Sequence, residues 1–377
     1  MTSFGFLSTY PPTQCGLATF TESLALALRD GPRSADIGVV RVVEHPEPIC
    51  SAEVVHHLLK RASGGETAAA AALDRFDVAV IQHEYGIYGG LDGEAVIEIL
   101  RRLHVPSLVV FHTVLVNPTK HQRIVLEQVA RAATSVVVMT ATAEQRLLDG
   151  YRVDPSKIVV IAHGAPTDWG AIPRRQKAGP PMILTWGLLG PGKGIEWAVE
   201  ALAELVDLDP SPRYVIAGET HPHVVEHSGE SYRNMVAARA EALGVGHLVR
   251  FENRYLDRPA LRGLVAAADV VVLPYDSTDQ VTSGVLIEAV TAGRPVVATA
   301  FPHAVELLSS GAGIIVGHRD PAAIAAAVRR VLTEPGVADA MSDVALSLVP
   351  DLTWAAVASR YGELADHTLE ASTSIPA

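Results

Sequence analysis

Short runs of apolar residues alternate along most of the chain with longer stretches in which apolar residues recur at helical spacing. This alternation predicts strands joined by crossover helices, the arrangement of parallel α/β sheets. In the first half, strands are predicted at residues 4–7, 37–43, 78–81, 108–111, 136–139 and 158–161. Helices are predicted between them, for example at residues 17–28 and 95–103.

The alternation stops between residues 164 and 181, where proline, glycine and basic residues replace the apolar periodicity, so we expect an interdomain linker there. It resumes with strands predicted at residues 183–185, 214–217, 248–251, 270–273, 295–298 and 313–316. Helices are predicted at 195–205 and 322–332. A final helix, from residue 354 to about 369, carries Trp354, Val357, Tyr361 and Leu364 on one stripe.

These patterns predict two doubly wound, Rossmann-like α/β domains. The first spans residues 1–172 and the second residues 181–353, and the helix at 354–377 is expected to pack back on the first domain. A length of 377 residues also favours two domains.

Composition narrows the class of protein. Hydrophobic residues at 49% and charged residues at 19% indicate a well-packed soluble protein. The net charge of -12 argues against nucleic-acid binding. With only Cys15 and Cys50, neither a disulfide framework nor a cysteine zinc site is predicted. No apolar run approaches the roughly 18 residues of a spanning helix, and no signal peptide is recognisable. We therefore expect a cytoplasmic protein, and this is compatible with peripheral contact at the inner face of the membrane.

The segment from Asp276 to Thr299 sets a Ser283-Gly284 pair and Glu288 between two apolar strands. A helix is predicted after Gly284, with Gly293 as its cap. Helix amides at the carboxyl end of a strand bind phosphate, and Gly284 leaves room for close approach. At a rise of about 1.5 Å per residue, the Glu288 carboxylate lies roughly 7.5 Å along the axis, in reach of a ribose. An ordinary helix start with an exposed glutamate is the alternative.

The sequence from Gly187 to Gly194 is a glycine-rich turn between a strand and a helix, and Lys193 is its cation. It predicts a second phosphate contact. A solvated turn lysine is the alternative.

In the first half, polar residues follow the predicted strands. His112 comes directly after one strand, and the segment from Gln82 to Gly86 follows another. Both segments are predicted to lie at a ligand crevice, although His112 hydrogen-bonded within its own loop explains the pattern equally well. His83 and Glu84 have no third metal ligand at useful spacing, so no metal site is expected.

Gly16 lies where the first strand turns into the first helix, and its small size allows a ligand to approach the backbone. The turn is not a G-x-G-x-x-G sequence, so NAD binding is not predicted and no cofactor is expected. Cys15 is expected to be a packed loop residue.

Five segments together carry a family resemblance: 9–16 (TYPPTQCG), 82–86 (QHEYG), 111–113 (FHT), 187–194 (GLLGPGKG) and 280–288. The chain resembles the retaining GT-B glycosyltransferases of family 4, in particular their bacterial mannosyltransferase-like branch. The resemblance implies a GT-B fold, in which two Rossmann-like domains face each other across a cleft. It implies metal-independent transfer of a hexose from GDP-mannose or a UDP-hexose. Mannose is the first candidate for the transferred sugar. The acceptor is expected to be a carbohydrate, a lipid-linked molecule or a small molecule.

The predicted site residues fall into three groups. The catalytic group comprises His112, Lys193 and Gln280. The donor-binding group comprises Gly16, Gly187, Gly192, Arg254, Ser283, Gly284, Val285 and Glu288. The acceptor-binding group comprises Gln82, His83, Glu84 and Tyr85. The role of His163, before the linker, is left open.

Two positions depart from the family pattern. Leu188 stands where many members carry an arginine, so Arg254 is the candidate for a second cation, with a surface ion pair as its alternative. Gln280 stands where the family has a glutamate. An amide binds sugar hydroxyls but cannot stabilise positive charge at an oxocarbenium-like carbon. Asp276 and Asp279 are candidates for a carboxylate near the sugar, although both residue types are common in turns and caps.

These departures keep two other functions open. One is a nucleotide-sugar epimerase of the same architecture, and the other is a catalytically impaired nucleotide-sugar-binding protein. Lys120, His121 and Arg123 begin an amphipathic helix that could meet an anionic acceptor or a membrane surface. A solvated helix face is the favoured interpretation of these three residues.

Overall fold

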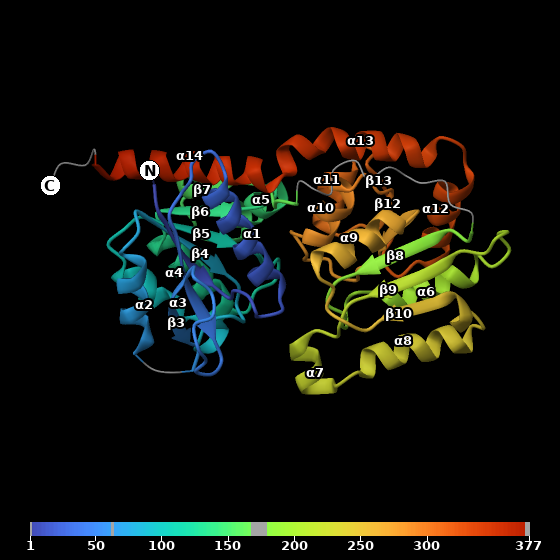
Figure 1. The fold of residues 1–377 in the computed structure, drawn as a ribbon, viewed down its shortest axis with the longest axis horizontal. Coiled ribbons are helices and arrows are strands. Elements are labelled where there is room, and N and C mark those ends of the chain that lie inside the picture. Colours follow the sequence, from blue (N-terminus) through green and yellow to red (C-terminus); the bar gives the residue numbers. More distant parts are fainter. Residues whose placement is uncertain (1, 62–63, 167–178, 374–377) are drawn as a thin grey trace. The chain divides into compact units, whose positions relative to one another are not determined.

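The computed structural model describes residues 2–61, 64–166 and 179–373, and these divide into two compact units (Figure 1). The N-terminal unit comprises Met1–Gly164 with Thr353–Ala377, and the C-terminal unit comprises Ala165–Leu352. Most of the predicted linker, residues 167–178, lies outside the described residues.

The described part of the N-terminal unit contains a seven-stranded parallel sheet in the order β3-β2-β1-β4-β5-β6-β7. Its strands are β1 (Phe4–Ser8), β2 (Ile37–Val43), β3 (Val54–Leu59), β4 (Val78–His83), β5 (Ser107–Phe111), β6 (Ser135–Val138) and β7 (Ile158–Val160). Its helices are α1 (Gly16–Asp30), α2 (Gly65–Leu73), η1 (Leu91–Gly93), α3 (Ala95–Arg102), α4 (Lys120–Ala132), α5 (Ala141–Gly150), η2 (Pro155–Lys157) and α14 (Trp354–Thr373). The central strands are buried on both faces, which explains their uninterrupted apolar sequences.

Helix α14 lies beside α1 although most of the chain separates them in sequence (Figure 1). Trp354, Val357 and Tyr361 are buried in the same apolar cluster as Phe6 and Phe20. The C-terminal helix is therefore part of the core of the N-terminal unit.

The described part of the C-terminal unit contains a six-stranded parallel sheet in the order β10-β9-β8-β11-β12-β13. Its strands are β8 (Met182–Trp186), β9 (Arg213–Ala217), β10 (Val249–Glu252), β11 (Val270–Leu273), β12 (Val296–Thr299) and β13 (Gly313–Val316). Its helices are α6 (Ile195–Ala203), α7 (Pro222–Ser228), α8 (Ser231–Ala242), η4 (Gly246–Leu248), α9 (Arg258–Ala267), α10 (Gly284–Thr291), α11 (Pro302–Leu308), α12 (Pro321–Thr333) and α13 (Val337–Leu352). Helix α6 packs against α8 and α12, and α10 packs against α13 (Figure 1).

Both sheets reverse their strand order at one point, between β1 and β4 in the first unit and between β8 and β11 in the second. Open α/β sheets bind ligands at the carboxyl ends of the strands beside such a point. Gly16 begins the helix after β1, Gln82 lies near the end of β4, and His112 follows β5, while the loops after β8 and β11 carry Lys193 and Ser283. The sequence segments that predicted chemistry thus lie at the two switch points.

The prediction of two doubly wound α/β domains is confirmed, since all twelve predicted strands are present within a residue or two. Strand β3 was not predicted, and neither were α7, α8 and α13. Among the described helices, none combines the length and the apolar character needed to cross a membrane.

Candidate functional site

The glycine-rich turn after β8 packs closely against the end of β11. Gly194 caps α6 with φ +62°, and a Cβ there would lie 1.9 Å from the carbonyl oxygen of Pro274. The amide of Asp276 donates to the carbonyl oxygen of Gly192 at 2.9 Å. Gly187 lies next to α10, because a Cβ there would meet Cγ2 of Val285 at 3.4 Å. The structure therefore brings three predicted donor-binding residues, Gly187, Gly192 and Val285, to one switch point.

Lys193 is half-buried, and its Nζ lies 4.4 Å from the centroid of the Tyr275 ring. A cation over a tyrosine face gains electrostatic attraction and keeps its hydrogen-bond donors available. The residue that follows Tyr275, Asp276, accepts a hydrogen bond from Trp197 Nε1 at 3.1 Å. The Lys193 cation is therefore held where the loops after β8 and β11 meet.

Ser283 is the N-cap of α10, and its hydroxyl accepts from the amide of Leu286 at 3.2 Å. Its own amide donates to Nδ1 of His303 at 2.8 Å. The first-turn amides of Gly284 and Val285 have no acceptor inside the helix, as in any α-helix. Gly284 and Val285 are therefore better placed than Ser283 to donate to a bound anion. The predicted cap at Gly293 is confirmed by its φ of +63°.

Glu288 lies half-buried on α10 and accepts a hydrogen bond from Trp186 Nε1 at 3.1 Å. Burial raises the pKa of its carboxyl group to about 7, and the hydrogen bond from Trp186 opposes that shift. Trp186 ends β8 and is itself buried, so it fixes the carboxylate beside the glycine-rich turn.

Gln280 has a local structural partner. Its Nε2 donates to the carbonyl oxygen of Thr282 at 3.1 Å, a bond that a glutamate carboxylate could not make. Asp276 is also engaged, by Trp197 and by Arg319, while the amide of Asp279 donates to the Ser277 hydroxyl at 3.3 Å. The catalytic role of Gln280 stays a prediction, and its amide stabilises the loop that precedes α10.

Two arginines are candidates for the second cation. Arg254 is 65% exposed, with its Nε 3.8 Å from Glu252 Oε2. Arg319 was missed by the sequence reasoning. It lies between β13 and α12 with φ +56°, and its Nε is 3.2 Å from Asp276 Oδ2. Because Asp276 bonds to the glycine-rich turn, Arg319 belongs to the same loop network as Lys193.

In the N-terminal unit, His112 directly follows β5, and its amide donates to the carbonyl oxygen of His83 at 3.2 Å. Its Nε2 lies 2.6 Å from Gln82 Oε1, and its ring meets Phe20 edge-on at 4.9 Å. Burial lowers the pKa of His112 to about 3, and the nearby His163 and His83 add to that shift. His112 is therefore a neutral imidazole at neutral pH.

The side chains of the four predicted acceptor-binding residues differ in burial. The side chains of Gln82 and His83 are buried, whereas Glu84 and Tyr85 are half-buried. His83 lies between the rings of Phe111 and Tyr85, and neither of its ring nitrogens has a partner among the described residues. Burial raises the pKa of Glu84, which accepts from the Thr113 hydroxyl. Acceptor binding by these residues stays a prediction.

His163 lies in the same aromatic group as His112. Its Nδ1 donates to the carbonyl oxygen of Gly164 at 2.7 Å, and its ring packs against Phe20 and Trp354. Burial lowers the pKa of His163 to about 4. Sequence reasoning could not find this arrangement, because Trp354 comes from the distant α14.

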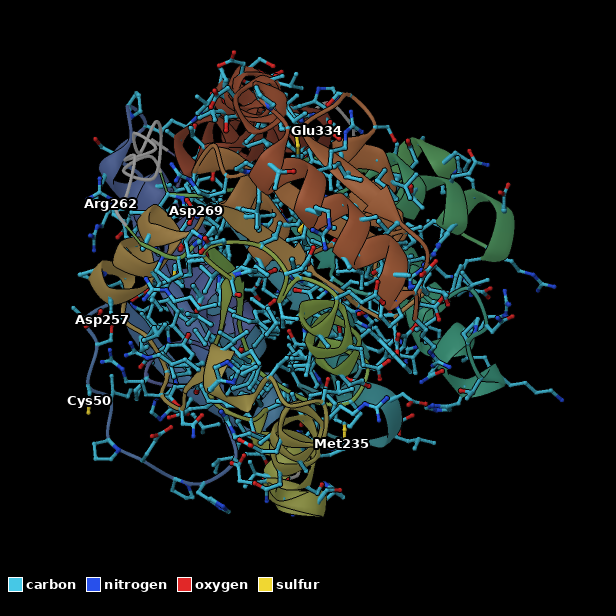
Figure 2. The ribbon with its side chains drawn as sticks, turned by 90° about the vertical axis from the view of Figure 1, so that its right-hand side faces the viewer. Cys50, Met235, Asp257, Arg262, Asp269 and Glu334 are labelled. Carbon is cyan, nitrogen blue, oxygen red and sulfur yellow. The ribbon has the colours of Figure 1, made fainter. Side chains whose placement is uncertain are left out.

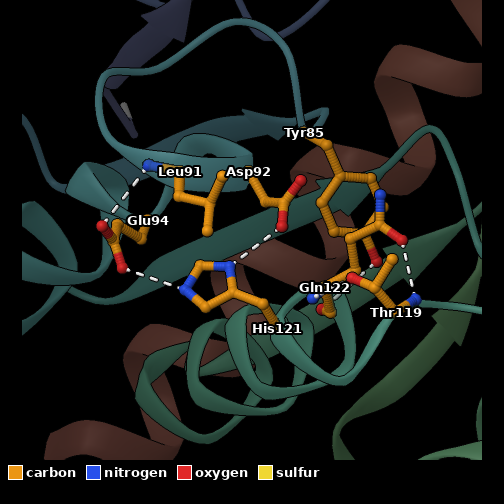
Figure 3. Close-up of polar contacts among 7 residues, drawn as sticks. All are labelled: Tyr85, Leu91, Asp92, Glu94, Thr119, His121 and Gln122. Carbon is orange, nitrogen blue, oxygen red and sulfur yellow. Dashed lines mark hydrogen bonds and ion pairs between the residues drawn. The ribbon is translucent and has the colours of Figure 1, made fainter.

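Two of the three basic residues at the start of α4, His121 and Arg123, are engaged in contacts within the N-terminal unit. His121 is held by Asp92 at 2.9 Å and by Glu94 at 3.2 Å (Figure 3). These two carboxylates raise its pKa. Arg123 donates to the carbonyl oxygen of Gly150 and lies over the Tyr151 ring. Of the three residues, Lys120 alone is exposed, which weakens the case for an anion site there.

The first helix begins at Gly16, and a Cβ at Gly16 would meet no protein atom within 4 Å. Cys15 is its N-cap and accepts from the amide of Ala18 at 3.4 Å, so it has a structural role. Cys50 lies on an exposed loop between β2 and β3 (Figure 2). Neither cysteine forms a disulfide.

Comparisons with protein families match both halves of the chain. Residues 22–169 match the family described as Glycosyltransferase Family 4, and residues 180–334 match Glycosyl transferases group 1. The two matches cover the segments that carry His112 and Lys193.

Curated relatives carry two kinds of name. Glycogen synthase of Mycobacterium tuberculosis is 30% identical over 233 residues, which is 61% of this chain and 53% of that protein. D-inositol 3-phosphate glycosyltransferase of Corynebacterium glutamicum is 30% identical over 260 residues, 64% of this chain and 59% of that protein. The chain thus spans little more than half the length of these relatives.

Solved structures resemble the whole chain. Sucrose-phosphate synthase from Thermosynechococcus elongatus has a TM-score of 0.78 at 19% identity, covering 98% of this chain and 100% of that one. Anabaena Alr3699/HepE, solved with UDP-glucose, has a TM-score of 0.75 at 13% identity, covering 97% and 99%. At these identities the likeness confirms the predicted fold.

Proposed function

We propose that this chain, whose two halves match glycosyltransferase families and which has a GT-B fold, is a family 4 glycosyltransferase that transfers a hexosyl group from a nucleoside diphosphate sugar to an acceptor hydroxyl. The observation that carries the proposal is the meeting of Lys193, the start of α10 and Glu288 at the β8/β11 switch point. Cation, free amides and carboxylate match the diphosphate and the ribose of such a donor.

In the proposed reaction, the bond between the anomeric carbon and the diphosphate oxygen breaks, and a bond to the acceptor oxygen forms on the same face. Lys193 and the amides of Gly284 and Val285 stabilise the negative charge on the leaving diphosphate. The leaving diphosphate takes the acceptor proton, so the step needs neither a side-chain base nor a metal. Retention and metal independence are part of this proposal.

The transferred sugar and the acceptor are also part of the proposal. The mannosyltransferase-like resemblance favours mannose from GDP-mannose, whereas UDP-glucose is bound by the structural relative Alr3699/HepE. We propose the acceptor classes carbohydrate, lipid-linked molecule and small molecule. Acceptor panels with and without anionic vesicles test these classes together with peripheral membrane contact.

Thermal shifts with GDP, UDP and ADP, followed by product analysis with GDP-mannose and UDP-glucose, test the function. We expect stabilisation by one nucleotide and acceptor-dependent release of that nucleotide. Conversion of the donor sugar without acceptor would identify an epimerase. Stabilisation with every donor left intact would identify a binding protein, the alternative that Leu188 and the Gln280–Thr282 bond favour. Stabilisation by no nucleotide would refute the proposal.

A further inference from the structure

We propose that Gln82 is a positioning residue, which fixes neutral His112 with its proton on Nε2 and leaves Nδ1 as a hydrogen-bond acceptor for a ligand hydroxyl. The identity of that hydroxyl as one on a sugar rests on the proposed function. The tautomer itself does not rest on it.

The pairing of β4 with β5 brings the two side chains together. Gln82 lies opposite Val110 in the register of the two strands. Side chains two residues apart in a strand share one face of the sheet, so His112, just past the strand end, continues the face of Val110. Gln82 and His112 are therefore diagonal neighbours, a relation that long side chains can bridge.

The backbone around this pair is also held. The Tyr88 hydroxyl donates to the carbonyl oxygen of Gln82, and the amide of His112 donates to the carbonyl oxygen of His83. Gln82 has no exposed surface. A buried amide with a fixed backbone has little freedom to turn away, so the 2.6 Å contact between its Oε1 and His112 Nε2 is a built feature.

This contact decides the tautomer. An amide oxygen only accepts hydrogen bonds, so with the Gln82 amide in this orientation Nε2 of His112 is the donor, and Gln82 Nε2 has no partner among the described residues. A neutral imidazole carries a single N–H, which leaves a lone pair on Nδ1. Burial keeps the imidazole neutral, and its neighbours Phe20, His83 and His163 carry no negative charge that would favour the imidazolium form.

The neutrality of Gln82 explains the choice of residue. A glutamate in its place would hold the same proton but would favour the imidazolium form, as carboxylates beside histidines do. Imidazolium has two donors and no acceptor, and it attracts anions. An amide partner instead leaves a neutral acceptor, which suits a hydroxyl donor.

The tautomer is measured directly by two-bond ¹⁵N–¹H correlation spectra of the full chain labelled with ¹⁵N-histidine, with His112 assigned by its loss in His112→Ala. In the wild type we expect the Nε2–H form to persist from about pH 8 down to about pH 5. The Nδ1–H form in the wild type would overturn the proposal, because it would mean that the Gln82 amide group donates.

Two variants test whether Gln82 sets the tautomer, and Gln145→Leu, an exposed glutamine on α5, is the matched control. In Gln82→Leu we expect a mixture of tautomers and a fall in kcat of about 10- to 100-fold with little change in donor KM. In Gln82→Glu we expect His112 to titrate at higher pH and the acid limb of the kcat/KM profile to move with it. An unchanged His112 spectrum in both variants would also overturn the proposal.

The two proposals fail separately. If the spectra show the Nε2–H tautomer and its loss in Gln82→Leu while no donor is consumed, then the transferase function is wrong and the positioning role of Gln82 stands. Thermal melts of both variants identify one that does not fold, and the wild-type spectrum tests the tautomer without either Gln82 variant.

Discussion

The two units share a strand order around their switch points but present opposite chemistry there. In the N-terminal unit, His112 and His163 are imidazoles whose low pKa values keep them neutral. In the C-terminal unit, the loop after β8 presents the Lys193 cation and helix α10 carries the Glu288 carboxyl group. The same fold therefore carries uncharged imidazoles at the strand ends of one unit and a cation with a carboxyl group at those of the other.

The difference has a structural cause. In the N-terminal unit, the carboxyl-end side chains pack against aromatic rings, from Phe20 on α1 and Trp354 on α14, and lose water. In the C-terminal unit, the carboxyl-end loops are joined by polar contacts, such as the Asp276 contacts to Trp197 and Arg319. Burial disfavours charge on the histidines of the first environment, whereas in the second the ion pair of Asp276 with Arg319 supports charge, although burial disfavours the charged form of Glu288.

The largest expected effect is from Lys193→Ala. If Lys193 stabilises the leaving diphosphate, kcat should fall by about 100- to 1000-fold, the usual effect of removing one such group. Steady-state kinetics with the donor identified above measure this loss. The control is Lys60→Ala, which removes a lysine paired with Glu44 in the N-terminal unit. Equal kinetics in both variants would contradict the assignment of charge to the C-terminal site.

An intermediate effect is expected from Arg319→Ala, which we compare with Arg254→Ala. The two arginines are almost equally exposed, at 66% and 65%, and each pairs with one carboxylate. Loss of a charge-assisted contact to the diphosphate should lower kcat/KM by about 10- to 100-fold. We expect that loss for Arg319, because its partner Asp276 bonds to the turn that carries Lys193. A loss confined to Arg254→Ala would instead support the prediction made from sequence.

The smallest effect is on stability, from Glu288→Gln. The folded protein keeps the Glu288 proton up to a pKa of about 7, whereas the unfolded chain loses it near the ordinary glutamate pKa of 4.5. Stability from this group is therefore present at low pH and is lost as the pH rises through that window. The variant should melt at a higher temperature than the wild type at about pH 8 and at a similar temperature at about pH 5. Each kcal/mol of added unfolding free energy should raise the melting temperature by about 2–4 °C. Calorimetry at both pH values measures this difference in melting temperature. A bound nucleotide should raise the melting temperature of the variant less than that of the wild type. A variant that melts below the wild type at about pH 8 would contradict the burial argument.

The fold could be predicted from the sequence because buried parallel strands have continuous apolar sequences. The exception is β3, whose sequence includes His56 and His57 and which lies half-buried at the sheet edge. Helix α8 escaped prediction because charged residues surround its few buried positions, Tyr232, Val236 and Ala240 among them.

The candidate site could be predicted from the sequence only in part. Loop positions such as Lys193 and Gly284 could be placed, because they follow predicted strands. Side-chain partners could not be placed, since Gln82 and His112 are 30 residues apart and Trp186 and Glu288 are 102 apart. Arg319 was not predicted as a second cation, because a single arginine after a strand is not part of a sequence pattern that indicates a phosphate site.

The packing of Trp354 against Phe20 and His163 has a consequence for synthesis of the chain. Helix α14 is translated after the entire C-terminal unit, yet it completes the core of the N-terminal unit. Domains generally fold as units during translation. The surroundings of His112 are therefore completed only after the C-terminal unit has been synthesised, and the C-terminal unit has the opportunity to fold before them.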